Sequence, residues 1–275
     1  MISPTPVRFL IISDTHGEWP YNARNPAPKV DVVIHCGDLT QCGGLSSVRK
    51  AIEDISSVDA NLRLVIAGNH DLELDTTWCR EFGEPDDAEE RQKIRDFLDS
   101  QNDVVFLDEG KYKFNLTSGA SFTLYASPYT PAFGDWAFMY KPNEDHFNET
   151  SNYSDPSYRF EPHPISDDVD IVMTHGPPYF PDFNLDTNSS GQHCGCPMLA
   201  KAIQKVKPRM HCFGHIHEGR GTAMMRWEDG TGITENVEAI RDTLKENERK
   251  SLETLMVNAA MHGNATGGVI IDMDF

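Results

Sequence analysis

The sequence has little positive charge and no long apolar run. Its 275 residues include 24 lysines and arginines against 43 aspartates and glutamates, which gives a formal net charge of −19. Proteins that bind long nucleic acids gain much of their affinity from clustered basic residues, so this balance argues against such a partner. No stretch of about 18 apolar residues occurs, which argues against a transmembrane helix and against a membrane partner.

Paired cysteines and a secretory start are also missing. None of the six cysteines belongs to a Cys-x-x-Cys pair, which argues against a zinc knuckle or a disulfide framework. Residues 1–6 lack the charged start and the apolar run of a signal peptide. We therefore expect a cytoplasmic protein with reduced thiols. The sequence gives no indication of its oligomeric state.

Short apolar runs alternate with helical patterns along much of the chain. Buried strands are expected at residues 7–12, 30–35, 62–67 and 169–174, and further strands at 121–125, 209–213, 222–227 and 268–273. Helices are expected at 47–55 and 86–98. The length and this alternation predict a single α/β domain over residues 1–275, with mainly parallel central strands.

Two segments depart from the alternation. Residues 133–164 are rich in proline, asparagine, aspartate and aromatic residues and have no clear period, so we expect a long surface excursion there. Residues 235–250 are highly charged, yet Val237, Ile240 and Leu244 share one helical face. This pattern predicts an exposed helix whose charges form a solvated face.

Five short motifs at strand ends combine histidine with aspartate or asparagine. They are Asp14-Thr15-His16, Gly37-Asp38, Gly68-Asn69-His70-Asp71, Thr174-His175-Gly176 and Gly214-His215-Ile216-His217. Imidazole and carboxylate groups bind zinc, iron and manganese, and one carboxylate can bridge two ions. Each motif alone more often has a structural role. The ordered set predicts a metal centre, because ligands gather at the carboxyl ends of strands in α/β sheets.

A two-metal centre of this kind suits phosphate ester chemistry. Two ions about 4 Å apart can hold the attacking and leaving oxygens of an in-line displacement at phosphorus. We expect a hydroxide shared by the two ions to attack the ester. Two divalent ions, the carboxylates of Asp14 and Asp38, and this hydroxide leave the site near a charge of +1. Such a site could attract a phosphodiester within an acidic protein.

In order and wording, the motifs resemble those of the calcineurin-like metallophosphoesterase superfamily. They look closest to its subgroup of metallophosphoesterase-domain-containing brain proteins. The resemblance extends from Asp14 to His217 and so covers most of the chain. It implies a four-layer αββα sandwich with the metal ions at the edge of the sheets.

The resemblance also implies a role for each motif residue. It assigns one metal ion to Asp14, His16 and His217 and the other to Asn69, His175 and His215, with Asp38 bridging the two. His70 would act at the leaving group without binding metal, and Asp71 could orient its imidazole. Asn69 and His70 would then also face the substrate.

Residues outside the motifs give weaker indications. Arg220, just after the last motif, could contact a phosphate, although an exposed arginine without a partner is about as common. The aromatic residues Phe133, Trp136, Tyr129 and Tyr179 could stack on a nucleobase, but we expect most of them to pack in the core.

These observations favour a dinuclear metal-dependent phosphodiesterase that hydrolyses small phosphodiesters such as nucleotide esters. The alternatives are a broad-range phosphomonoesterase and a non-catalytic, metal-bearing scaffold for protein contacts. The scaffold is the weakest alternative because every expected ligand position holds a ligand. Manganese, or iron with manganese, is favoured over zinc alone, because oxygen and nitrogen ligands are mixed and no thiolate is offered.

Overall fold

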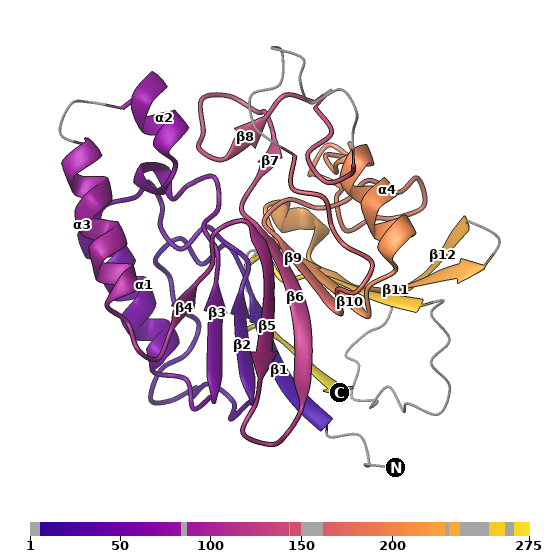
Figure 1. The fold of residues 1–275 in the computed structure, drawn as a ribbon, viewed down its shortest axis with the longest axis horizontal. Coiled ribbons are helices and arrows are strands. Elements are labelled where there is room, and N and C mark those ends of the chain that lie inside the picture. The colour runs from indigo at the N-terminus through magenta and orange to yellow at the C-terminus, as the bar shows by residue number, and fades with distance from the viewer. Residues whose placement is uncertain are drawn as a thin grey trace.

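The computed structural model describes residues 6–83, 87–142, 144–149, 162–228, 231–236, 253–261 and 267–275. Two large sheets lie face to face, and helices cover their outer faces (Figure 1). Within the described residues, no helix combines the length and the apolar character needed to cross a membrane.

The first sheet has five strands in the order β14-β1-β2-β3-β4. Their bounds are β1 Pro6–Ile12, β2 Val32–His35, β3 Leu62–Val65, β4 Val105–Phe106 and β14 Val269–Asp274. The strands β1 to β4 run parallel, and β14 joins β1 in the antiparallel direction. Almost uninterrupted apolar runs predicted β1, β2 and β3, because central parallel strands are covered on both faces. The two-residue strand β4 was not predicted.

The second sheet has seven strands in the order β12-β11-β13-β10-β9-β6-β5. Their bounds are β5 Gly110–Asn115, β6 Ser121–Ser127, β9 Ile171–Thr174, β10 Met210–Phe213, β11 Gly221–Glu228, β12 Thr231–Asn236 and β13 Glu253–Asn258. The strands β6, β9, β10 and β13 run parallel, and the outer strands pair antiparallel. A small sheet pairs β7 (Thr130–Pro131) with β8 (Met139–Tyr140).

Three hydrophobic cores separate four layers. One core lies between the two sheets and includes Phe9, Ile34 and Met173. A second packs α1 (Leu45–Ser56) and α3 (Asp87–Asp99) on the first sheet, and a third packs α4 (Pro197–Val206) on the second. The predicted αββα sandwich is therefore confirmed. A short helix α2 (Thr76–Glu81) and two single 3₁₀ turns, η1 (Leu72–Leu74) and η2 (His217–Gly219), lie in connecting loops.

The element bounds differ from the sequence prediction in a few places. The strand β2 begins at Val32 rather than at residue 30, and β3 ends at Val65 rather than at residue 67. The sequence reading did not identify β13, which is central to the second sheet. Of the helix predicted at 235–250, the first two residues end β12 and the others lie outside the described residues.

The segment predicted as a surface excursion enters the interior in part. Phe133 is exposed, but Phe138, Met139, Tyr140 and Phe147 are all buried. This departs from the prediction because Phe138, Tyr140 and Phe147 pack in the two helix-covered outer cores. Within 133–164, residue 143 and residues 150–161 lie outside the described part.

Candidate metal centre

The five motifs lie in the loops that follow β1, β2, β3, β9 and β10. Because the parallel strands of each sheet end on the same side, these loops meet at one edge of the sandwich. Their side chains form three groups, each with ligand atoms within 4.8 Å of one another: Asp14 with His16 and His217, His16 with Asp38 and His70, and Asp38 with His175 and His215.

The first and third groups match the two predicted ligand sets, and Asp38 lies next to both. Its Oδ2 atom is 3.8 Å from Nε2 of His16 and 3.4 Å from Nε2 of His175. Asn69 completes the second set, with its Oδ1 atom 2.9 Å from Nε2 of His175. The fold thus brings together every side chain predicted to bind metal. Their roles as ligands remain a prediction.

Backbone carbonyls orient two of the histidine rings. The Nδ1 atom of His16 donates to the Thr40 carbonyl at 3.2 Å, and Nδ1 of His175 donates to the Cys36 carbonyl at 2.8 Å. A carbonyl can only accept, so each Nδ1 carries a proton and each Nε2 faces the cluster. Histidine ligands of metals are held in this way in many proteins. The donor set therefore fits metal ions.

The pKa shifts of the clustered side chains also fit a metal site. Burial alone would lower the pKa of His175, but the neighbouring Asp38 and Asp14 raise it to about 9. Burial would raise the pKa of Asp14, but the hydrogen bond from His217 and the charge of His175 lower it. The buried carboxylates thus hold a proton on His175. Metal binding releases protons held at such ligands.

The backbone at the cluster adopts rarely used conformations. Among the described residues, six other than glycine have positive φ, and Asp14, His16, Asp38 and His215 are four of these. Backbone strain of this kind gathers at functional sites. Gly214 is also required, because a Cβ atom there would overlap the carboxylate of Asp14 and the side chain of Ser13.

His70 is held by a different partner from the one predicted. Its Nδ1 atom donates to the Gln41 carbonyl at 2.7 Å. The Asp71 carboxylate instead accepts hydrogen bonds from the backbone N–H groups of Gly68, Leu39 and Thr40 and from the Thr40 hydroxyl. The prediction that Asp71 orients the imidazole is therefore wrong. Asp71 instead joins two loops of the site, a role that the motif resemblance did not imply.

Arg220 has partners that its prediction as a phosphate contact did not anticipate. Its Nη1 atom donates to the carbonyls of Ala259 and Ala260 at 2.9 and 2.8 Å, and Nη2 donates to Gly267 at 2.6 Å. The guanidinium thus ties the end of β13 to the start of β14. Three of its five N–H groups are thus bonded to backbone carbonyls, which gives Arg220 a structural role. A contact with substrate stays a prediction.

Replacing Arg220 by glutamine should lower the free energy of unfolding by about 2 kcal/mol, because buried carbonyls lose their donors. KM for a phosphate ester should not change. Urea unfolding and steady-state kinetics check both, with the exposed Arg24→Gln as the matched control. A raised KM with unchanged stability would restore Arg220 to the substrate site.

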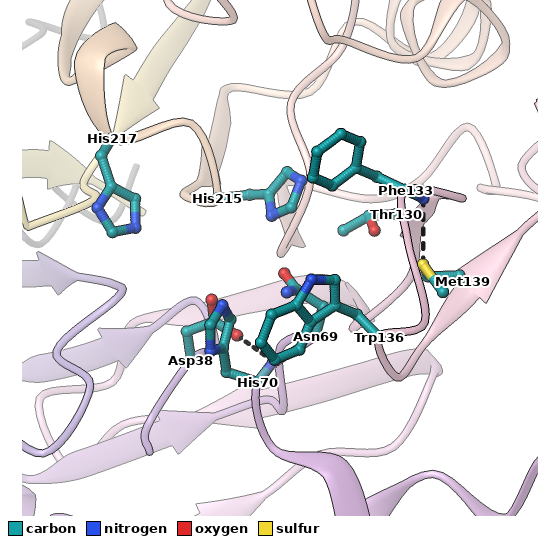
Figure 2. A pocket seen from close by; sticks show the side chains of 9 residues that line it. All are labelled: Asp38, Asn69, His70, Thr130, Phe133, Trp136, Met139, His215 and His217. Carbon is teal, nitrogen blue, oxygen red and sulfur yellow. Dashed lines mark hydrogen bonds between the residues drawn. The ribbon is translucent and has the colours of Figure 1, made fainter. Parts of the chain in front are cut away.

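A pocket of about 110 Å³ opens beside the cluster. It is lined by Asp38, Asn69, His70, Thr130, Phe133, Trp136, Met139, His215 and His217 (Figure 2). The indole of Trp136 stacks on the His70 ring, with centroids 4.0 Å apart and an interplanar angle of 28°. Trp136 belongs to none of the five motifs, so the sequence did not predict its contact with His70.

The other aromatic candidates pack elsewhere. Tyr129 contacts Phe138 and His146, and Tyr179 contacts His193. Neither tyrosine lines the pocket. Tyr129 is half-buried and packs against both helix-covered cores, as expected. Tyr179 is also half-buried, but its printed ring contact is with His193 and not with a hydrophobic core.

The sequence is similar to those of several known proteins. The sequence is 31% identical to human Metallophosphoesterase domain-containing protein 1 over 80% of this chain and 66% of that protein, in agreement with the predicted subgroup. It is also 31% identical to Probable rhamnogalacturonate lyase C of Emericella nidulans, over 81% of this chain and 18% of that protein. The chain thus spans only part of the length of each relative.

A phosphopantetheinyl hydrolase from Mycobacterium tuberculosis has a solved structure with 14% sequence identity and a TM-score of 0.42, covering 82% of this chain and 87% of that one. The calcineurin-like phosphoesterase family matches residues 7–219. This range includes all five motifs, and the chain therefore belongs to the calcineurin-like phosphoesterase family.

Proposed function

We propose that this chain is a dinuclear metal-dependent phosphodiesterase that hydrolyses small phosphodiesters such as nucleotide esters. The observation that supports the proposal is the convergence of two ligand groups on Asp38, beside a pocket. A carboxylate shared between two ligand groups can hold two metal ions together. A metal-bearing scaffold would not need a pocket with a histidine in its wall.

His70 supplies a proton at the leaving oxygen. Because its Nδ1 atom donates to the Gln41 carbonyl, proton transfer falls to Nε2. The stacked Trp136 fixes the plane of the ring, so that Nε2 keeps its direction in the pocket. General-acid help of this kind contributes about 10²–10⁴-fold to a rate.

The metal ions supply charge at the phosphoryl oxygens and hydroxide near neutral pH when they are bound. Asp14, His16 and His217 would hold one ion, Asn69, His175 and His215 would hold the other, and Asp38 would be shared between them. Manganese, or iron with manganese, suits this mixture of oxygen and nitrogen ligands, and zinc is the third choice.

The pocket wall favours a diester over a monoester. None of the described residues that line the pocket is lysine or arginine. A monoester dianion gains from cationic side chains that clamp its extra charge, whereas a diester carries one charge. Arg220 does not line the pocket, and three of its N–H groups are bonded to backbone carbonyls.

The test is hydrolysis of bis-p-nitrophenyl phosphate and of p-nitrophenyl phosphate by metal-free protein titrated with Mn²⁺. We expect metal-dependent turnover with a preference for the diester. A preference for the monoester would replace the proposal by the phosphomonoesterase. No turnover of either compound by protein with two metal ions bound would leave the scaffold as the better explanation.

Small phosphate esters are the partners that this proposal requires, and the acidic net charge of −19 supplies no surface for long nucleic acids. A cytoplasmic location is part of the proposal. Fractionation of cells that express a tagged chain would test it, and recovery with membranes or in the medium would contradict it.

A further inference from the structure

Phe133 is the most exposed large hydrophobic residue in the part of the chain that the structure describes. Its exposed fraction is 76%, compared with 48% for Phe82 and 38% for Val105. A single exposed hydrophobic side chain is ordinary on a protein surface. The position of Phe133 is not ordinary, because it lines the pocket that also contains Asp38, His70 and His215.

The backbone around Phe133 is firmly held. Its segment connects β7 to β8, and the N–H of Ala132 donates to the Tyr140 carbonyl at 2.8 Å. The N–H of Phe138 donates to the buried Asp75 carboxylate at 2.8 Å, and Trp78 donates through Nε1 to the Asp135 carbonyl at the same distance. The exposed ring is therefore carried by an ordered turn.

The same turn joins the metal cluster directly. The N–H of Ala137 donates to the carbonyl of Asn69 at 3.2 Å, and Trp136 stacks on His70. Phe133 and Trp136 stand on different sides of the pocket in Figure 2. Backbone hydrogen bonds and the stacking of Trp136 on His70 therefore fix the position of this turn, and with it the position of Phe133, relative to the predicted metal ligands.

The pocket has two chemically distinct parts. Asp38, Asn69, His70, His215 and His217 make a polar part, whereas Phe133, Trp136 and Met139 make an apolar part. A ligand that fills both parts carries a phosphate at one end and an apolar group at the other. Aromatic rings offer flat faces, and stacking of a nucleobase on an aromatic side chain contributes about 1–3 kcal/mol per base, or about 5- to 150-fold in affinity.

We infer that Phe133 determines specificity by stacking on a planar aromatic group of the substrate, so that the site selects phosphate esters of nucleosides over those of aliphatic alcohols. This inference rests on the proposed function for the phosphate end of the ligand. It assigns the ring of Phe133 to the base and leaves the phosphate to the polar part of the pocket.

The test compares a ligand that carries a base with one in which a hydroxyl group replaces the base. Adenosine 5′-monophosphate and ribose 5-phosphate are titrated by calorimetry into protein loaded with Mn²⁺. We expect the nucleotide to bind on the order of tenfold more tightly to the wild type. Phe133→Ala should bring the two affinities together by weakening only the nucleotide. Phe133→Tyr should keep the preference, and Phe133→Leu should lose most of it because leucine has no flat face.

Phe82→Ala is the matched control, because Phe82 is exposed but lies outside the pocket. An unchanged preference in Phe133→Ala, equal affinities in the wild type, or failure of the wild type to bind either ligand would each overturn the inference. Hydrolysis of bis-p-nitrophenyl phosphate is measured on the same preparations. Absence of hydrolysis counts against the proposed function. The ratio of the affinities for adenosine 5′-monophosphate and ribose 5-phosphate tests the role of Phe133 separately.

Discussion

Replacing His70 by alanine is expected to lower the turnover of a phosphodiester by about 10²–10⁴-fold while the protein keeps its metal ions. The alanine variant loses the Nε2 proton donor in the pocket. It keeps the backbone N–H of residue 70, which donates to Oδ1 of Asp38 at 2.8 Å and so holds that carboxylate in place. Turnover is measured with bis-p-nitrophenyl phosphate, and metal content by plasma mass spectrometry after dialysis.

The comparison variant is Asp38→Asn, which should lose metal as well as turnover. Asp38 lies beside both predicted ligand sets, 3.8 Å from His16 and 3.4 Å from His175, and an uncharged amide is a much weaker ligand than a carboxylate. His163→Ala serves as the control, because this histidine is about half exposed and does not line the pocket. If His70→Ala and Asp38→Asn lost metal to the same extent, the proposed division of roles would be wrong.

Replacing Asp71 by asparagine is expected to lower the free energy of unfolding by about 3 kcal/mol or more. Both oxygens of this buried carboxylate accept hydrogen bonds, from Thr40 on one side and from Leu39 and Gly68 on the other. An amide would turn its NH₂ group toward N–H or O–H donors whichever way it is oriented. At least one buried donor would then have no acceptor.

Urea unfolding of metal-free protein measures this effect without the contribution of bound ions. The exposed Asp103→Asn makes the same chemical change without burial and should leave stability unchanged. Asp71→Asn should also weaken metal binding, because the loops it joins carry Asp38 and Asn69. Full stability together with a loss of turnover equal to that of His70→Ala would instead return Asp71 to the proton-transfer machinery.

The alternation of apolar runs and helical patterns predicted an α/β fold with parallel central strands, and the motif resemblance implied the four-layer sandwich and the candidate ligands. The apolar runs at 7–12 and 30–35 are typical of strands that are covered on both faces, and their alternation with helical patterns predicted parallel strands. The ligand motifs follow such strands directly. Their convergence was therefore predictable, because strand direction fixes the edge at which each loop emerges.

Only the tertiary structure decided which groups support these ligands. Gln41, not Asp71, holds the His70 ring, and it does so through a carbonyl that every residue type possesses. Arg220 is bonded to the backbone near β14, a contact across 39 or more positions of the chain that no local pattern reveals. Phe133 reaches the pocket because hydrogen bonds from a distant loop place its turn. Local periodicity reports which face a residue presents, whereas hydrogen bonds between remote backbone groups leave no trace in side-chain composition.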